Sequence, residues 1–271
     1  MTRIRDSRFR KIVGCAIAAL ALSQTAAPLR AQTAADKVIA DTDLSGPLDT
    51  RPGWRFVAYQ APDGPDLAFP DQTAPGAVTL CLHKEAGAPC AIRLEAMAPK
   101  TSAYGWDAHY LDFAKVVHPP DGAPLLMVRT RSLHSADGGQ AVFTQLFAYR
   151  PASDRFVRVY DHVTGTNNNQ EVRYIASGPL AGGVVVAEPT SKGPYRFWVT
   201  VSEMKPSSDY RQVLRYRSAT GYNDGNVLKV IDSEMPNIER RLGLWRPGQP
   251  LPLPAAGCAR PELRHMELWC S

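Results

Sequence analysis

Two polar segments carry the side chains best suited to ligand chemistry. Residues 164–170 read TGTNNNQ, and residues 220–226 read TGYNDGN. Asn, Asp and Gly tolerate positive φ, so both segments predict tight turns. Their amide and carboxylate groups can also hydrogen-bond a polyol or glycan while a tyrosine ring packs on its apolar face. Both interpretations stand, and the candidate ligand-binding residues are Asn167, Asn168, Asn169, Tyr222, Asn223 and Asp224.

Carboxylates near these segments give an alternative, hydrolytic interpretation. They are Asp161, Glu171, Asp224, Asp232 and Glu234, of which Glu171 and Asp224 are the candidate catalytic residues. A glycosidase needs two carboxyl groups roughly 5–10 Å apart. Sequence does not set that distance, so a carboxylate-dependent hydrolase of a glycan or envelope polymer stands as the alternative to a binding protein.

Other catalytic signatures are missing from the sequence. It contains no G-x-S-x-G, H-E-x-x-H or P-loop motif. No two histidines lie at i, i+2 or i, i+4, which argues against a metal site built on one strand or helix. We therefore predict no metal and no cofactor. Whether the protein is an enzyme is left undecided, and a non-enzymatic binding or envelope-associated module is favoured.

The N-terminal segment 1–31 is typical of a secretory signal peptide. Basic residues precede the apolar run IVGCAIAALAL at 12–22, which is shorter than the roughly 20 apolar residues that span a bilayer. Cleavage is predicted after Ala31, with Ala35 as the alternative. An uncleaved anchor is the other interpretation. We expect a periplasmic or extracellular protein with no stable membrane span after cleavage.

Charge is concentrated in the same segment. The chain has a formal charge of +5, but residues 1–31 hold six basic residues and one acidic residue. Outside them, basic and acidic residues balance at 25 each. A nucleic-acid-binding protein usually carries its positive field on the folded domain. Nucleic acid is therefore excluded as a predicted partner, while a glycan or an envelope protein fits.

Four cysteines follow the N-terminal segment, at Cys81, Cys90, Cys258 and Cys270. An even number in an exported chain predicts disulfides. Their spacing predicts two local bridges, Cys81–Cys90 and Cys258–Cys270.

Short β-branched and aromatic segments bounded by Gly, Pro, Asn or Asp predict a mainly β fold. The predicted strands are 54–59, 77–83, 90–95, 109–117, 124–131, 141–150, 155–161, 171–176, 183–188, 195–203, 210–217 and 226–231. Their spacing resembles the strand rhythm of β-propellers, and a curved antiparallel sandwich would give much the same pattern. One short helix is predicted near the C-terminus, at 260–268.

The expected domain organisation has four parts. They are the signal peptide at 1–31, a polar lead-in at 32–53, an all-β domain at 54–245, and an appendage at 246–271 closed by a disulfide. The proline-rich run 245–254 leads from the domain into the appendage. Such a run is either a stiff connector or a polyproline ligand for a partner protein.

Overall fold

The computed structural model describes residues 36–66, 68–69, 71–85, 90–94, 107–205 and 209–271. The predicted signal peptide and both predicted cleavage sites lie outside these ranges. The described chain is mainly β with antiparallel sheets, as predicted, and it forms neither a closed barrel nor a closed propeller. No helix within the described ranges has the length and apolar character needed to cross a membrane.

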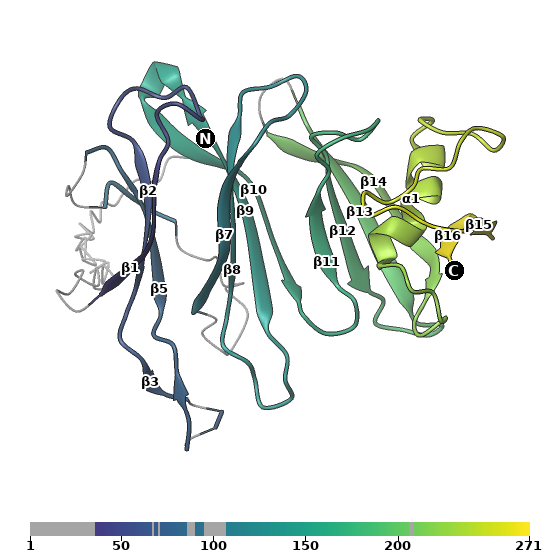
Figure 1. The fold of residues 1–271 in the computed structure, drawn as a ribbon, viewed down its shortest axis with the longest axis horizontal. Coiled ribbons are helices and arrows are strands. Elements are labelled where there is room, and N and C mark those ends of the chain that lie inside the picture. Colours follow the sequence, from purple (N-terminus) through teal and green to yellow (C-terminus); the bar gives the residue numbers. More distant parts are fainter. Residues whose placement is uncertain (1–35, 67, 70, 86–89, 95–106, 206–208) are drawn as a thin grey trace, which may run out of the picture. The chain divides into compact units, whose positions relative to one another are not determined.

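Three four-stranded sheets follow one another along the chain (Figure 1). The first has the order β1-β2-β5-β6, formed by β1 (Lys37–Asp43), β2 (Arg55–Gln60), β5 (Val78–His83) and β6 (Ile92–Arg93). A short hairpin of β3 (Gly64–Pro65) and β4 (Thr73–Ala74) separates β2 from β5. The segment expected to be a polar lead-in therefore contains β1, a strand that the sequence analysis missed.

The second and third sheets are meanders in which sequential strands pair. The second has the order β10-β9-β8-β7, formed by β7 (Tyr110–Val117), β8 (Leu125–Arg131), β9 (Ala141–Arg150) and β10 (Arg155–Gly165), with the 3-10 turn Pro151–Ser153 between β9 and β10. The third contains β11 (Glu171–Tyr174), β12 (Val184–Pro189), β13 (Arg196–Met204) and β14 (Tyr210–Gly221) in that order. All predicted strands except 226–231 overlap observed ones.

The second sheet is buried on both faces, and β8 shows how. Alternate residues of a strand point to opposite faces. Leu126 and Val128 join an apolar cluster with the first sheet, including Phe56. Leu125 and Met127 join a second cluster with the third sheet. Burying each such side chain stabilises the fold by roughly 1.5–3 kcal/mol, so these clusters hold adjacent sheets together.

A helix, α1 (Val230–Arg241), covers the other face of the third sheet. Ile231 and Ile238 are fully buried there against strand residues such as Val199. The prediction of a strand at 226–231 is therefore wrong. Its β-branched residues lead into a helix whose buried side includes Glu234 and whose interior contains Pro236. These two residues hide the helical periodicity of the sequence.

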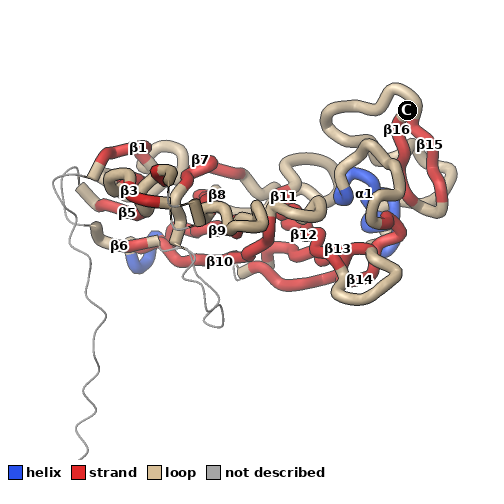
Figure 2. Tube along the Cα trace, turned by 90° about the horizontal axis from the view of Figure 1, so that it is seen from below, coloured by secondary structure: helices blue, strands red, loops and turns tan. Residues whose placement is uncertain are grey.

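The predicted C-terminal helix at 260–268 is also wrong. The segment forms a hairpin of β15 (Pro261–Arg264) and β16 (Glu267–Cys270). His265 and Met266 make its turn with φ of 50° and 72°, a left-handed conformation that ends any helix. Figure 2 shows the hairpin beside α1. Both predicted disulfides, Cys81–Cys90 and Cys258–Cys270, are present.

Candidate functional site

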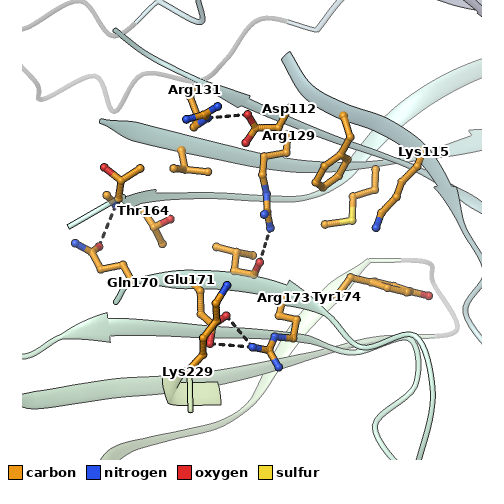
Figure 3. Close-up of a pocket in the computed structure, with 16 residues that line it drawn as sticks. Asp112, Lys115, Arg129, Arg131, Thr164, Gln170, Glu171, Arg173, Tyr174 and Lys229 are labelled. Carbon is orange, nitrogen blue, oxygen red and sulfur yellow. Dashed lines mark hydrogen bonds and ion pairs between the residues drawn. The ribbon is translucent and has the colours of Figure 1, made fainter. Parts of the chain in front are cut away.

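A cavity of about 490 Å³ lies between the second sheet and strand β11 (Figure 3). Its charged side chains come from β7, β8, β11 and the residue before α1. The cations are Lys115, Arg129, Arg131, Arg173 and Lys229, and the anions are Asp112 and Glu171. We call it the inter-sheet cavity. Its lining is strongly basic, although the chain beyond residue 31 has no net charge.

Strand β8 aims two arginines into this cavity. Arg129 and Arg131 share a face with Leu125 and Met127, because side-chain direction repeats every two residues. The apolar pair packs against the third sheet at one end of β8. The arginines continue the same inward face past the end of that apolar packing. Packing of the two sheets thus positions cationic groups at the edge of the core.

Two of the cavity's arginines are neutralised by ion pairs. Arg131 Nε donates to Asp112 Oδ1 at 2.6 Å. Arg173 Nη2 donates to Glu171 Oε2 at 3.0 Å and to Asp232 Oδ2 at 3.1 Å. Burial alone would lower the pKa of Arg173, but the bonds and charges of Asp232 and Glu171 outweigh it and raise that pKa. These two guanidinium groups are held firmly and already have partners.

Arg129 differs from both. Its Nη2 donates to the backbone carbonyl of Val172 at 2.6 Å, and no ion pair to it is found among the described residues. Its Nε is buried without any hydrogen-bond partner. Burial lowers the pKa of Arg129, opposed by the charges of Asp112 and Glu171. A half-buried guanidinium with an unused donor is costly unless an acceptor completes its bonding.

Two further buried polar atoms without partners belong to the same pair of facing sheets. Thr144 Oγ1 is one, and Thr144 pairs with Arg129 in the β8–β9 register, which places both on one face. Tyr174 Oη is the other, and Tyr174 lines the cavity. Burial raises the pKa of Tyr174, so this hydroxyl stays a neutral donor. Of these two groups, only Thr144 is a cross-strand neighbour of Arg129.

The remaining cations and one ring complete the lining. Lys115 and Lys229 are exposed, and no ion pair to either is found in the described part of the chain. The Phe113 ring lies between cations, with Lys115 Nζ 4.8 Å and Arg129 Cζ 5.1 Å from its centroid. Such contacts hold flexible cationic side chains in place. The cavity therefore presents the positive charges of Lys115, Arg129 and Lys229 to a ligand.

Comparison with known protein families, with curated proteins and with solved structures gives no match for this chain.

The first predicted ligand-binding segment lies beside the inter-sheet cavity. Thr166 and Gln170 line the cavity, and Asn167, Asn168 and Asn169 connect them as exposed residues. Asn168 and Asn169 have φ of 66° and 57°. These asparagines thus form a tight turn, and they also lie next to the cavity in the chain.

The second predicted segment lies elsewhere. The Tyr222 ring stacks on Phe197 with centroids 5.7 Å apart, and Asn223 has φ of 57°. Asp224 accepts hydrogen bonds from the backbone N–H groups of Gly221 and Asn226, at 3.0 and 2.9 Å. These bonds give Asp224 a turn-forming role. The two segments lie at the same end of the third sheet, but 164–170 precedes β11 and 220–226 follows β14, the two outermost strands, which the spacing of strands puts roughly 14 Å apart.

The two candidate catalytic residues do not share a described cavity. Glu171 lines the inter-sheet cavity, whereas Asp224 lines none of the cavities described. Glu171 Oε1 also accepts the backbone N–H of Ile231 at 3.0 Å. It therefore caps the N-terminus of α1 from a neighbouring strand. Within the described ranges, no group of three potential ligands could hold a metal ion.

Sequence reasoning missed Arg129, although a signal for it existed. The segment LLMVRTR of β8 alternates, with Leu125 and Met127 on the same face as Arg129 and Arg131. Apolar residues mark an inward face, so arginines that continue that face are candidates for a buried or cavity-lining position. Whether such arginines have acidic partners depends on neighbouring strands, and this information is absent from the segment itself.

Proposed function

We propose that the protein is an extracytoplasmic, non-enzymatic binding module whose inter-sheet cavity binds an anionic group of an acidic glycan. The observation that carries this proposal is Arg129, which is half-buried, has no described ion-pair partner and keeps an unused buried donor at Nε. Acidic sugars carry carboxylate or sulfate groups. Each is a planar or tetrahedral oxygen cluster that a guanidinium can bind through two parallel hydrogen bonds.

The lining supports an anion over a neutral ligand. Because Asp112 and Glu171 are bonded to other arginines, they leave Arg129, Lys115 and Lys229 to attract an incoming charge. A charge-assisted hydrogen bond contributes about 1.5–3 kcal/mol, roughly twice a neutral one. A bound carboxylate would also offset the desolvation of the Arg129 guanidinium.

The surroundings support a saccharide as the carrier of that charge. Thr166 and Gln170 line the cavity, and the exposed amides of 167–169 lie between them in the chain. Hydroxyl and amide side chains hydrogen-bond sugar hydroxyls in both donor and acceptor directions. The first segment singled out in the sequence thereby joins the proposed site, while Tyr222, Asn223 and Asp224 do not.

The proposal includes export of the protein out of the cytoplasm. Residues 1–31 have the composition of a signal peptide, and the two local disulfides suit an oxidising compartment. We further propose a propeller-like relation among the sheets. Its support is that the second and third are four-stranded meanders, the unit that propellers repeat.

Isothermal titration calorimetry tests the binding function. The probes are tetragalacturonate, which carries four carboxylates, and maltotetraose, a neutral saccharide of the same length. We expect the protein to bind only tetragalacturonate. Arg129→Gln should weaken that binding about tenfold or more, whereas Arg211→Gln, at an exposed arginine outside the cavity, should not change it.

Two outcomes would overturn the proposal. One is equal binding of the charged and neutral saccharides. The other is equal loss of binding in Arg129→Gln and Arg211→Gln, which would indicate only general charge attraction. Release of shorter saccharides during the titration, abolished by Glu171→Gln, would favour the hydrolase instead.

A further inference from the structure

A second cavity, of about 560 Å³, lies on the other side of β11. Its walls are the β11–β12 connection, one face of α1 and the proline-rich segment after α1. We call it the helix cavity. Its volume is within the range of small-molecule sites, roughly 300–1,000 Å³. It is distinct from the inter-sheet cavity, although Arg173 and Tyr174 line both.

One face of α1 packs against the third sheet, and another lines the helix cavity. Ile231, Glu234 and Ile238 face the third sheet and are completely buried. Asp232, Met235 and Glu239 repeat the same i, i+3, i+7 spacing one residue further along, and all three line the helix cavity. The helix thus presents a row of two carboxyl groups and a thioether to the cavity.

The proline-rich segment closes this cavity from outside. Trp245 is 5% exposed, and its Nε1 donates to the carbonyl of Pro250 at 2.9 Å. This hydrogen bond folds the segment back on itself, and Pro252 and Pro254 also line the cavity. Together with Ile175 and Leu180 they make its walls largely apolar. The segment predicted as a stiff connector or polyproline ligand therefore forms part of a binding wall of its own chain.

Glu239 is the unpaired group in this cavity. Its residue is 6% exposed, and no hydrogen bond or ion pair to its carboxyl group is found in the described chain. The nearby arginines are engaged elsewhere, because Arg240 and Arg241 both donate to Asn237 Oδ1. Asp232, by contrast, is bonded to Arg173. Because Asp232 shares the one positive charge of Arg173 with Glu171, the cavity is net negative when Glu239 is ionised.

We infer that the helix cavity binds a small organic cation, a primary ammonium group carried on a hydrocarbon body, with Glu239 as its counter-ion. An ammonium group supplies three donors to a carboxylate that has none. The apolar walls around Met235 and Trp245 match the hydrocarbon body of the ligand. Burial of a charge is tolerated when an opposite charge and hydrogen bonds accompany it, and the ligand would supply both.

The test uses a panel of three cations, butylammonium, cyclohexylammonium and benzylammonium, with benzyl alcohol as the neutral analogue of the last. Calorimetry with the mature chain should show saturable binding of at least one cation and none of benzyl alcohol. Glu239→Gln keeps the shape of the side chain but removes its charge, and should weaken binding at least about tenfold. Glu85→Gln, at an exposed glutamate, should leave binding unchanged.

A second variant tests the cavity by changing its volume without changing its charge. Met235→Phe adds volume inside the cavity and should abolish cation binding while the thermal unfolding transition remains cooperative. The inference is overturned if no cation of the panel binds, if benzyl alcohol binds as well as benzylammonium, or if Glu239→Gln binds like the parent. None of these results depends on whether tetragalacturonate binds the inter-sheet cavity.

Discussion

Arg129 on β8 donates a hydrogen bond to the backbone carbonyl of Val172 on β11, with 2.6 Å between Nη2 and the oxygen. Strand β8 belongs to the second sheet and β11 to the third, so this bond joins two sheets that also meet through apolar side chains and through the His162–Glu188 contact at 3.1 Å. It fixes one end of the guanidinium and leaves Nε unbonded. An arginine held in this way is preorganised, which lowers the entropy cost of binding an anion.

The planar guanidinium of Arg129, and not only its positive charge, should determine the affinity for tetragalacturonate. Arg129→Lys keeps the positive charge but replaces five planar donors with a compact ammonium group. We expect its affinity for tetragalacturonate to fall about tenfold, as expected when a bidentate contact is lost. Calorimetry at 50 and 200 mM NaCl should show a similar salt dependence for both proteins, because the charge is the same. Unchanged affinity in Arg129→Lys would show that geometry is unimportant at this site.

Asp154 ties the first sheet to the second and should make stability depend on pH. It accepts hydrogen bonds from Trp54 Nε1 and Tyr149 Oη, each at 2.8 Å, and from Lys84. The bonds from Lys84, Trp54 and Tyr149 hold the pKa of Asp154 well below the usual 3.8. A lowered folded-state pKa gives stability that is present above about pH 4 and is lost as pH falls through that lower value.

Asp154→Asn removes this charge and keeps a residue type that tolerates the φ of 46° at this position. Urea unfolding at pH 7 should therefore show a lower free energy of unfolding for the variant. The difference should narrow steadily below pH 4, where Asp154 begins to protonate in the unfolded parent chain. A difference that stays constant from pH 7 to pH 2 would contradict the electrostatic origin.

Glu234 fastens α1 to the third sheet and should be essential for stability. Its residue is completely buried, and it accepts hydrogen bonds from Tyr216 Oη at 2.7 Å, from the N–H and hydroxyl of Thr220 at 2.6 and 2.8 Å, and from Asn237 Nδ2 at 3.0 Å. Glu234→Ala leaves these donors buried without an acceptor. Each such donor costs about 1–3 kcal/mol, so we expect a loss of at least about 3 kcal/mol in urea unfolding. The matched variant Glu262→Ala, at an exposed residue paired with Arg264, should change stability by about 0.5 kcal/mol or less.

Most strands of the three large sheets could be predicted from sequence because their residue pattern is local. Strand β9 matches its predicted bounds because AVFTQLFAYR is mostly apolar and aromatic. Strand β1 could not be found this way, since KVIADTD gains its structure from pairing with β2. Helix α1 was hidden because its buried face includes Glu234, whose carboxylate accepts most of its hydrogen bonds from Tyr216 and Thr220 on the distant β14.

The residues of the cavities could also be predicted only where the sequence signal is local. The turn at 167–169 was visible in the sequence because asparagine and positive φ are locally linked. Glu171 and Asp232, by contrast, are far apart in the chain and meet only through Arg173. Pairing of charges across elements decides which groups remain available for a ligand. That is why Arg129 and Glu239 emerge only from the folded chain.

Glu239 should reduce stability at neutral pH, which is the opposite of Asp154. Burial raises the pKa of Glu239 above the usual 4.5, since the charged form is poorly solvated beside Met235 and Trp245. The folded protein then binds a proton more tightly than the unfolded chain, so stability falls as pH rises from about 4.5 through the raised value. Of the charged groups that line the cavity with it, Asp232 is also negative and Arg173 is engaged by Asp232 and Glu171. Glu239→Gln should consequently unfold at higher urea concentration than the parent at pH 8, and at the same concentration near pH 4. A variant less stable than the parent at pH 8 would show that the Glu239 carboxylate has a stabilising partner, and the cation proposed for the helix cavity would then have no unpaired charge to bind.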